Sequence, residues 1–454
     1  MVLNRYTVMS EAPAIRFSVQ PGGTLTGQLR VPGDKSISHR SIMLGSLATG
    51  DTRVSGFLEG EDSLATLAAF RAMGVRIEGP DAGALRIHGV GLHGLQAPRE
   101  ALYLGNSGTS MRLMSGLLAG QAFDTTLTGD ASLSVRPMQR VVGPLTSMGA
   151  RIDATPAGTA PLLIHGGAGL CGIDYAMPVA SAQVKSSVLL AGLYARGVTC
   201  VSEPAPTRDH TERMLAGMGY PLQREPGRVC LEGGHVLHGI SIDIPADISS
   251  AAFFLVGASI AADSNLLLEH VGMNPTRTGV IDILRRMGAN IEVSNARDVG
   301  GEPVADLRVR PSHLQGIEIP QELVPLAIDE FPVIFVAAAC AAGTTVLTGA
   351  EELRVKESDR IQVMADGLSA LGVSATATPD GMIIEGGPIS GGCVDSHGDH
   401  RIAMAFAMAA LRAQGAIEIL DCANVNTSFP GFVELARTAG LAIRSSAAAG
   451  AGVA

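Results

Sequence analysis

Two acidic side chains of this 454-residue chain lie where they could transfer protons. Asp329, in AIDEFPVIF, lies at the edge of a very apolar predicted helix, where burial could raise its pKa. Glu357, in RVKESDR, lies between Lys356 and Arg360, and these cations would lower its pKa unless a ligand anion intervenes. Two carboxyl groups in unlike environments can act as a base and an acid. The alternative for Asp329 is a helix N-cap without chemistry.

A basic, hydroxyl-rich segment, VPGDKSISHRS at 31–41, predicts an anion site. Asp34 or Ser36 can cap a helix there, and Ser36 and Arg40, four residues apart, share one face of it. Lys35, Ser36 and Arg40 then lie beside the free backbone N–H groups that attract anions to a helix N-terminus. A solvated basic cap on an ordinary helix would have the same sequence, so this segment alone does not decide between the two.

Cationic or hydroxyl-bearing helix starts recur along the chain, which favours a ligand site over surface decoration. They occur in LGNSGTSMR (104–112), SVRPMQR (134–140), VASAQVKSS (179–187), TRDHTER (207–213), RVKESDR (354–360) and GDHRIAM (398–404). The residues that we single out are Asn106, Gly108, Arg136, Ser181, Ala182, Gln183, Arg208, Lys356, Arg360 and Arg401. Their recurrence at matching points predicts that they converge on one or two small, highly anionic molecules.

The composition argues against several other classes of function. With 46% hydrophobic and 17% charged residues and a net charge of −10, the chain is typical of a soluble globular protein and not of a nucleic-acid binder. The N-terminal MVLNRYTVMSEAPAIRF has no apolar signal core, and the apolar stretches 248–262 and 331–342 are too short to span a bilayer. We therefore expect a cytoplasmic protein. Six cysteines without a C-x-x-C pair predict reduced, mostly buried thiols.

No metal and no organic cofactor is predicted. The segment GVGLHG at 89–94 fits the pattern G-x-G-x-x-G, but neither a helix nor a suitable acidic residue follows it, as dinucleotide binding would require. His39, His210 and His400 lack the spacing and the companions of a metal site.

A repeat predicts the elements that position these residues. AMGVRIE at 72, SMGARID at 147, GMGYPLQ at 217 and RMGANIE at 286 resemble one another, and ALGVSAT at 370 and TAGLAIR at 438 are weaker copies. Each glycine follows a helix-period stretch and precedes an alternating one, as a helix C-cap glycine before a strand does. Each unit thus reads strand, helix, strand, helix, strand. The first helices begin at Lys35-Ser36, Asn106-Ser107, Ser181-Ala182, 247–250, Asp329-Glu330 and Asp399-His400. Six units grouped by threes predict two α/β domains.

The repeat and eight segments together resemble the 5-enolpyruvylshikimate-3-phosphate (EPSP) synthase family, from about Leu25 to about Leu441. The segments are GDKSISHRS, LGNSGTSMRL, RPMQR, SAQVKS, TRDHTE, IDEFP, RVKESDR and DHRIAM. The resemblance implies a two-domain inverse α/β half-barrel of six βαβαββ repeats, three per domain, with the active site in the interdomain cleft. It assigns residues 1–32 and 247–454 to domain I and residues 33–246 to domain II, joined by two crossovers.

The resemblance also implies a reaction, the transfer of the enolpyruvyl group of phosphoenolpyruvate to the 5-hydroxyl of shikimate 3-phosphate with release of phosphate. Asp329 would accept the hydroxyl proton, Glu357 would help to protonate the methylene carbon, and Lys35 would contact both substrates. The implied shikimate 3-phosphate site comprises Lys35, Ser36, Arg40, Ser181, Ala182, Gln183, Arg208, Asp329 and Lys356. The implied phosphoenolpyruvate site comprises Lys35, Asn106, Gly108, Arg136, Gln183, Arg360 and Arg401. No cofactor is implied, and we expect a monomer.

The chain departs from one common version of the family at NTSFP (426–430), where many members have a lysine and this chain has Thr427. Together with RPMQR, SAQVKS and TRDHTE, this resembles the divergent second class of the family and leaves one cationic contact to phosphoenolpyruvate open. Gly108 matches the family position beside phosphoenolpyruvate, where the slightly longer inhibitor glyphosate also binds. We therefore expect a glyphosate-sensitive enzyme.

Two other functions stay open on the sequence alone. The related enolpyruvyl transferase that acts on UDP-N-acetylglucosamine has the same fold and usually a cysteine on a mobile loop. Here the first cysteine is Cys171, and the loop region contributes SVRPMQR instead. The other alternative is a non-catalytic anion-binding protein of the same fold, which would have no use for Asp329 and Glu357 as a base and an acid.

Overall fold

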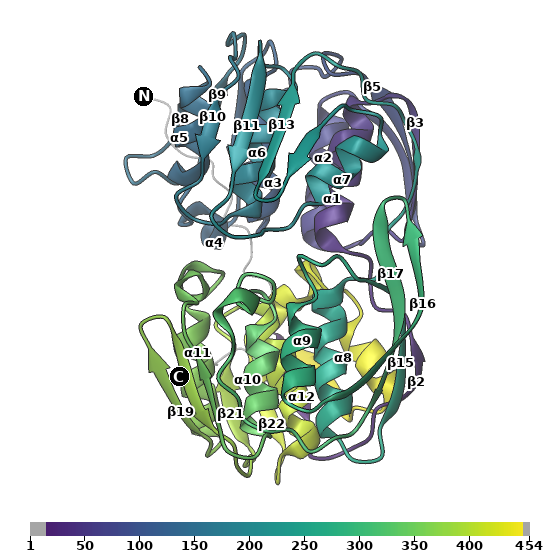
Figure 1. Cartoon of the computed structure of the whole chain (residues 1–454), viewed down its shortest axis with the longest axis vertical. Coiled ribbons are helices and arrows are strands. Elements are labelled where there is room, and N and C mark those ends of the chain that lie inside the picture. The colour runs from purple at the N-terminus through teal and green to yellow at the C-terminus, as the bar shows by residue number, and fades with distance from the viewer. Residues whose placement is uncertain (1–14, 448–454) are drawn as a thin grey trace.

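The chain folds into two lobes that lie one above the other along its longest axis (Figure 1). The computed structural model describes residues 15–447. Residues 1–14, on which most of the prediction about the N-terminus rests, and residues 448–454 lie outside the described part. Each lobe has its own hydrophobic core: residues 37–244 build the upper core, and residues 17–31 together with 246–443 build the lower one. The lower lobe is thus made from an early and a late segment of the described residues.

The upper lobe contains three units of the order strand, helix, strand, helix, strand, strand. The first unit consists of β14 (Ser241–Asp243), α1 (Lys35–Leu47), β3 (Thr49–Ser55), α2 (Glu61–Ala72), β4 (Arg76–Asp81) and β5 (Ala84–Val90). The second consists of β6 (Leu102–Tyr103), α3 (Gly108–Ala119), β7 (Thr125–Thr128), α4 (Ala131–Ser134), α5 (Gln139–Ser147), β8 (Arg151–Asp153) and β9 (Leu162–His165). The third consists of β10 (Asp174–Ala176), α6 (Ala182–Gly192), β11 (Val198–Ser202), α7 (His210–Gly217), β12 (Gln223–Glu225) and β13 (Arg228–Glu232). In each sheet the first two strands pair in parallel, and the last two are added antiparallel.

The lower lobe repeats the pattern with two variations. Its first unit consists of β2 (Thr26–Leu29), α8 (Ile248–Ile260), β15 (Asn265–Gly272), α9 (Gly279–Arg286), β16 (Asn290–Val299) and β17 (Glu302–Arg310). The second consists of η1 (Gln321–Leu323), α10 (Phe331–Ala339), β18 (Thr344–Leu347), η2 (Glu351–Val355), α11 (Arg360–Ala370), β19 (Ser374–Thr378) and β20 (Gly381–Glu385), with isolated parallel bridges at Gln315 and Glu318 in place of a first strand. The third consists of β21 (Gly392–Asp395), α12 (His400–Ala409), η3 (Ala410–Arg412), β22 (Ile417–Leu420), η4 (Ala423–Thr427), α13 (Phe432–Ala439) and β23 (Ile443–Ala447), and β1 (Ile15–Val19) fills the place of its last strand. The predicted fold of six βαβαββ repeats, three to a lobe, is confirmed.

Within residues 15–447 the chain passes between the lobes twice, through two segments that pair with each other. One segment leads from β2 into α1, and the other leads from β14 into α8. Gly33 and Ala246 form an antiparallel bridge, the Asp34 N–H donates to the Pro245 carbonyl (2.8 Å), and the Asp247 N–H donates to the Pro32 carbonyl (2.9 Å). Each crossover therefore begins directly after a strand that is already held in a sheet.

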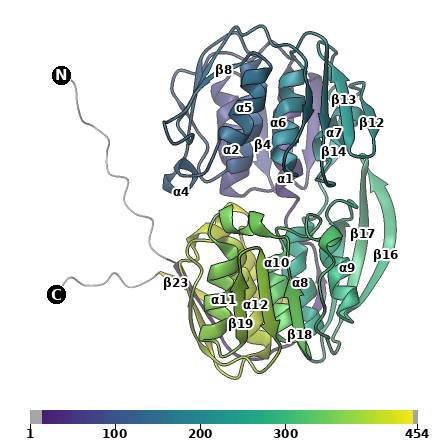
Figure 2. The same cartoon turned by 60° about the vertical axis from the view of Figure 1, so that its left-hand side comes forward.

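Most residues of the first helix in each unit are buried, so these helices lie in the interior of their lobes. Figure 2 shows α8, α10 and α12 near one another in the lower lobe. In the lower lobe α8, α10 and α12 pack against one another, and in the upper lobe α3 packs against α1 and α6. Every residue of α8 and of α10 is buried. Helices that are apolar on all sides are stable only inside a core, so packing fixes where their N-termini lie. Among residues 15–447, no helix combines the length and the apolar character needed to cross a membrane.

The glycines of the sequence repeat follow the second helix of each unit, as predicted. They adopt positive φ angles, which residues with a Cβ rarely adopt. The angles are 86° at Gly74, 101° at Gly149, 82° at Gly219, 97° at Gly288, 84° at Gly372 and 120° at Gly440. Each glycine thereby ends a helix and turns the chain into the next strand.

The prediction that all cysteines are reduced and mostly buried is wrong. Cys200 on β11 and Cys230 on β13 lie directly opposite each other in an antiparallel pair, with a Cα–Cα distance of 4.1 Å, and they form a disulfide. The two cysteines are 30 positions apart, so nothing in the local sequence indicates this pairing. Cys171 and Cys393 are exposed, whereas Cys422 is buried.

Gly217 and Gly219, in the third unit of the upper lobe, provide a matched test of the role of the repeat glycines. Replacing Gly219 by alanine should lower the free energy of unfolding by about 1–2 kcal/mol, because its φ of 82° is unfavourable for a residue with a Cβ. Gly217, two residues earlier, lies within α7, and a Cβ there would make only an ordinary contact of 3.8 Å with the Gly300 carbonyl. Gly217→Ala should therefore raise the free energy of unfolding by about 0.5–1 kcal/mol. Urea denaturation of both variants checks the pair, and equal effects would contradict the assignment.

Candidate active site

At the N-termini of the first helices, side-chain oxygens accept hydrogen bonds from backbone N–H groups and so cap the helices. Asp34 accepts from Ile37 at α1, Ser107 from Ser110 at α3, Ser181 from Val184 at α6, Asp247 from Ser249 at α8, and Asp399 from Arg401 at α12, with distances of 2.8–3.4 Å. Helix α10 differs, because its N-cap position is Glu330 and no side chain caps it. Asp329 is therefore not a helix cap, and its carboxylate is available for other contacts.

Asp329 is surrounded by cations from both lobes. Its carboxylate pairs with Arg208 of the upper lobe, and Lys356 Nζ and Arg360 Nη1 each lie 3.4 Å from its Oδ1. Arg401 Nη1 donates to the Asp329 carbonyl (3.1 Å). Burial raises the pKa of this carboxyl, but Lys356, Arg208, Arg401 and Arg360 together hold the pKa well below its usual range. The sequence suggested that burial could raise this pKa, but the net change is a decrease, because four positive charges outweigh the loss of solvent.

Glu357 lies beside Asp329 and shares one of its cations. Arg360 Nη2 donates to Glu357 Oε2 (2.6 Å), and Arg136 Nη1 of the upper lobe lies 3.7 Å from Oε1. Burial raises the pKa of Glu357, while Arg360, Arg136 and His400 lower it, and the net result is a pKa well below the usual value. The predicted direction is confirmed. One predicted neighbour is different, since Lys356 turns to Asp329 and Arg136 takes its place.

Arg360 joins the two acidic residues through a single guanidinium. This side chain is 1% exposed, and its Nε donates to Asp399 (2.8 Å) while its two other nitrogens contact Asp329 and Glu357. Its position at the start of α11 brings it to the N-termini of α10 and α12. Three carboxylates, of which Asp399 is fully buried, and one buried cation thus meet where three helices of the lower lobe begin.

The basic segment of α1 sends Lys35 to the junction between the lobes and Arg40 into the interior of the upper lobe. Lys35 Nζ pairs with Asp62 and donates to Ser428 Oγ of the lower lobe (2.7 Å). Arg40 instead points inward: its Nε donates to Thr211 (2.7 Å), Nη2 to Ser186 (2.8 Å) and Nη1 to the Ser36 carbonyl (2.9 Å). Burial lowers the pKa of Arg40 to about 10. In this structure Arg40 ties α1 to α6 and α7 while Lys35 bridges the lobes.

A second group of site residues forms around the start of α3. Arg136 Nη2 donates to Asn106 Oδ1 (2.5 Å), and Nη1 donates to the Asn106 carbonyl (3.2 Å). A Cβ on Gly108 would lie 3.4 Å from Nη1 of both Arg136 and Arg112. Arg112 donates to Gln183 Oε1 at 2.5 Å, which draws α3 and α6 together. Arg112 was not among the residues predicted from the sequence, although its place one helical turn after Gly108 could have indicated it.

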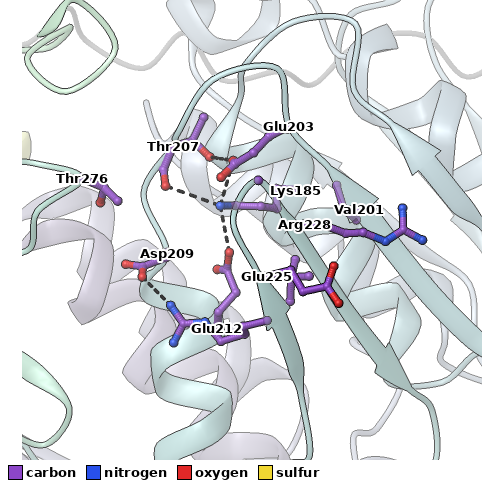
Figure 3. A pocket seen from close by; sticks show the side chains of 12 residues that line it. Lys185, Val201, Glu203, Thr207, Asp209, Glu212, Glu225, Arg228 and Thr276 are labelled. Atoms are coloured by element: carbon purple, nitrogen blue, oxygen red, sulfur yellow. Dashed lines mark hydrogen bonds and ion pairs between the residues drawn. The ribbon is translucent and has the colours of Figure 1, made fainter. Parts of the chain in front are cut away.

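A buried lysine supports the loop that carries Arg208 (Figure 3). Lys185 Nζ lies 3.0 Å from Glu203 Oε2 and 2.8 Å from Glu212 Oε1, and it donates to the Thr207 carbonyl (3.4 Å). Thr207 Oγ1 in turn donates to Glu203 (2.6 Å). These groups line a cavity of about 110 Å³ behind the loop. Lys185 lies within SAQVKS but was not singled out, because nothing in the sequence shows that its partners lie 18 and 27 residues further on.

The segment NTSFP places Thr427, where many family members have a lysine, inside the protein. This threonine is buried, and its hydroxyl donates to the Asn424 carbonyl (2.7 Å). The next residue, Ser428, accepts the hydrogen bond from Lys35. The segment therefore contacts the upper lobe through the hydroxyl group of Ser428, which was not among the residues predicted from the sequence.

The described residues contain no cluster of acidic, histidine or cysteine side chains that could hold a metal ion. His400 is buried at the start of α12, and burial lowers its pKa to about 3. His39 shares hydrogen bonds with Thr66 and Ser110 inside the upper lobe. Burial also lowers the pKa of His39 well below its usual value, so both histidines are neutral within the protein.

The chain matches the family described as EPSP synthase (3-phosphoshikimate 1-carboxyvinyltransferase) over residues 19–435. It is 72% identical over 430 residues to the 3-phosphoshikimate 1-carboxyvinyltransferase of Methylococcus capsulatus, which covers 95% of this chain and 98% of the relative. The relative of the same name from Alkalilimnicola ehrlichii is also 72% identical over 430 residues, and 94% of this chain and 96% of the relative are covered.

Solved structures show the same relationship. The EPSP synthase from Acinetobacter baumannii has a TM-score of 0.87 and 59% identity, with 95% of this chain and all of that chain covered. The enolpyruvyl transferase NikO from Streptomyces tendae, at 17% identity, covers 96% of this chain with a TM-score of 0.77 and supports the fold alone. Given a family match over most of the chain and relatives of full length at high identity, the chain belongs to the EPSP synthase family.

Proposed function

We propose that this chain transfers the enolpyruvyl group of phosphoenolpyruvate to the 5-hydroxyl of shikimate 3-phosphate, with Asp329, Glu357 and Lys35 as its catalytic residues. The observation that carries this proposal is the pair of carboxylates on one guanidinium, with Arg360 Nη1 3.4 Å from Asp329 and Nη2 2.6 Å from Glu357. Cations of the opposite lobe contact both acids. Such an arrangement suits two anionic substrates and a reaction that moves two protons.

The shikimate 3-phosphate site would lie mostly on the upper lobe. Lys35 at the start of α1 and Arg208 on its supported loop both reach across to the lower lobe, as contacts to Ser428 and Asp329 indicate. The full set that we propose is Lys35, Ser36, Arg40, Ser181, Ala182, Gln183, Arg208, Asp329 and Lys356. Arg40 would have to act from behind α1 or turn, because its three donor groups now face Ser36, Ser186 and Thr211.

The phosphoenolpyruvate site would lie between the start of α3 and the starts of α11 and α12. We propose that Lys35, Asn106, Gly108, Arg136, Gln183, Arg360 and Arg401 form it. Arg136 and Arg360 already contact Glu357 from opposite lobes, at 3.7 and 2.6 Å. A phosphate and a carboxylate placed between these arginines would complete their hydrogen bonding by bidentate contacts. No lysine at position 427 is needed for this arrangement.

The chemistry requires two pKa changes that substrate binding would itself supply. Both acids have lowered pKa values because cations surround them. Anionic substrates would pair with these cations and add negative charge, and both effects raise the pKa of a nearby carboxyl. Asp329 could then take the hydroxyl proton as the oxygen bonds to C2 of phosphoenolpyruvate, while Glu357 delivers a proton to C3. Loss of phosphate and of a C3 proton from this tetrahedral adduct yields the product.

We also propose the domain organisation, the cellular location and the oligomeric state of the enzyme. We propose two domains, residues 1–32 with 247–454 and residues 33–246, and the separation of the two hydrophobic cores at the crossovers supports this division. A cytoplasmic monomer that uses no cofactor and is inhibited by glyphosate is the form that we expect. Measuring phosphate release from the two substrates with purified protein tests the activity directly.

Asp329→Asn should retain shikimate 3-phosphate binding and lose turnover. The amide keeps the shape of the side chain but cannot accept the hydroxyl proton, and removal of a general base lowers kcat on the order of 10²- to 10⁴-fold. Steady-state kinetics together with calorimetric binding of shikimate 3-phosphate measure both effects. Asp282→Asn, at an exposed position in the first turn of α9, is the matched control and should leave kcat unchanged. A kcat for Asp329→Asn within a few-fold of wild type would rule out the base.

Gly108→Ala should weaken glyphosate binding more than phosphoenolpyruvate binding. The new methyl group would stand 3.4 Å from two guanidinium groups, in the space that the longer inhibitor needs. Such overlap costs roughly 1–3 kcal/mol, or about a factor of 5 to 150 in affinity. The ratio of the glyphosate inhibition constant to the phosphoenolpyruvate KM should therefore rise, with Gly217→Ala as the control. An equal shift of both constants, or tolerance of millimolar glyphosate by the unmodified enzyme, would contradict the placement of Gly108.

A further inference from the structure

A buried arginine outside the site described above holds the two crossover segments together. Arg277 lies between β15 and α9 and is 3% exposed. Its Nη1 donates to Asp34 Oδ2 (2.9 Å), and its Nη2 donates to Ser249 Oγ (2.6 Å) and to Asp247 Oδ1 (3.1 Å). Glu330 Oε1 lies 4.0 Å from the same nitrogen. One guanidinium therefore contacts three buried carboxylates.

The three carboxylates that Arg277 contacts lie at the N-termini of three different helices. Asp34 ends the first crossover and caps α1 through the Ile37 N–H (2.8 Å). Asp247 ends the second crossover, caps α8, and accepts the N–H of Lys35 (3.2 Å). Glu330 precedes α10 and accepts a hydrogen bond from Ser249. Arg277 thus reaches both crossovers and the N-termini of three helices.

Two of the carboxylates that Arg277 contacts belong to residues directly next in sequence to groups that we assign to catalysis. Lys35 directly follows Asp34, and Asp329 directly precedes Glu330. The two lobes supply these groups separately, so their relative position depends on how α1 is held against α10. Backbone pairing at Gly33 and Ala246 joins the crossovers to each other but does not include Glu330.

The charges show why a guanidinium is suited to this place. Burial raises the pKa of Asp34, but Arg277 and His210 lower it to about 2, so the carboxylate remains ionised. Without Arg277, the carboxylates of Asp34, Asp247 and Glu330 would repel one another in a buried space. An ammonium group could balance part of this charge, but it lacks the planar fork that contacts three partners in fixed directions.

We propose that Arg277 is a positioning residue that sets the distance between Lys35 and Asp329 across the crossovers. This inference rests on the proposed function, because it assumes that both groups act on the substrates. Arg277 touches neither substrate and contributes through the orientation of α1 and of the segment before α10.

The conservative variant Arg277→Lys tests the geometry, and Arg286→Lys, exposed on the neighbouring α9, is the matched control. We expect Arg277→Lys to lower kcat between about ten- and a hundredfold, as small displacements of reacting groups do. The dissociation constant of shikimate 3-phosphate should change less than threefold, and Arg286→Lys should match wild type in both measurements. An unchanged kcat in folded Arg277→Lys would overturn the inference.

The double variant Arg277→Gln with Asp34→Asn separates positioning from charge balance. Asparagine keeps the N-cap of α1, and the pair of changes removes one charge of each sign. We expect this variant to regain thermal stability relative to Arg277→Gln alone while its kcat stays at least tenfold below wild type. Recovery of both stability and kcat would overturn the inference, because Arg277 would then serve only to neutralise charge. Wild-type protein that releases no phosphate would instead refute the proposed function, and this inference with it.

Discussion

The charge of Arg360 has to be satisfied without water, and much of the site follows from that requirement. A guanidinium that is 1% exposed loses nearly all its hydration, so its stability depends on Asp399, Glu357 and Asp329. The carboxylates lie at or near the N-termini of α10, α11 and α12, where the helix dipole favours negative charge. The lower lobe can therefore hold three acids close together because one arginine lies among them.

Charges of opposite sign also compensate one another across the junction between the lobes. Arg208 and Arg136 come from the upper lobe, and their partners Asp329 and Glu357 come from the lower one. Arg140 and Glu352 form a further pair of this kind at 2.9 Å. Each lobe thus supplies charges that the other compensates. An anionic substrate that enters here competes with carboxylates of the protein for the same arginines, which links substrate binding to the contacts that hold the lobes together.

The sequence was sufficient for the features that depend on local pattern. The six glycines with positive φ and the starts of the first helices could be read directly, because a helix end and a cap leave a signature within a few residues. Motifs also identified Asp329, Glu357 and Arg360, which the structure brings into contact. The glycines and helix caps lie in short stretches of chain in which neighbours in sequence are neighbours in space. Asp329 and Arg360 are 31 residues apart, and it was the recurrence of similar motifs that grouped them.

Features that depend on distant pairing could not be predicted in the same way. The disulfide between Cys200 and Cys230 follows from the register of β11 and β13. The inward turn of Arg40 depends on partners more than 140 residues away on α6 and α7. The lowered pKa of Asp329 depends on Arg208, which lies 121 residues earlier in the chain. In each case the physical cause is a contact that only the folded chain creates.

The position of β1 has a consequence for the order of folding during synthesis. β1 ends at Val19, yet its partners β22 and β23 begin at Ile417 and Ile443. The ribosome must therefore make about 400 further residues before the first of these pairings can form, which takes roughly 20–80 s at about 5–20 residues per second. Residues 33–246 contain every strand of the upper lobe, so that lobe can close while β1 still lacks both neighbours in its sheet. The lower lobe is begun first and completed last.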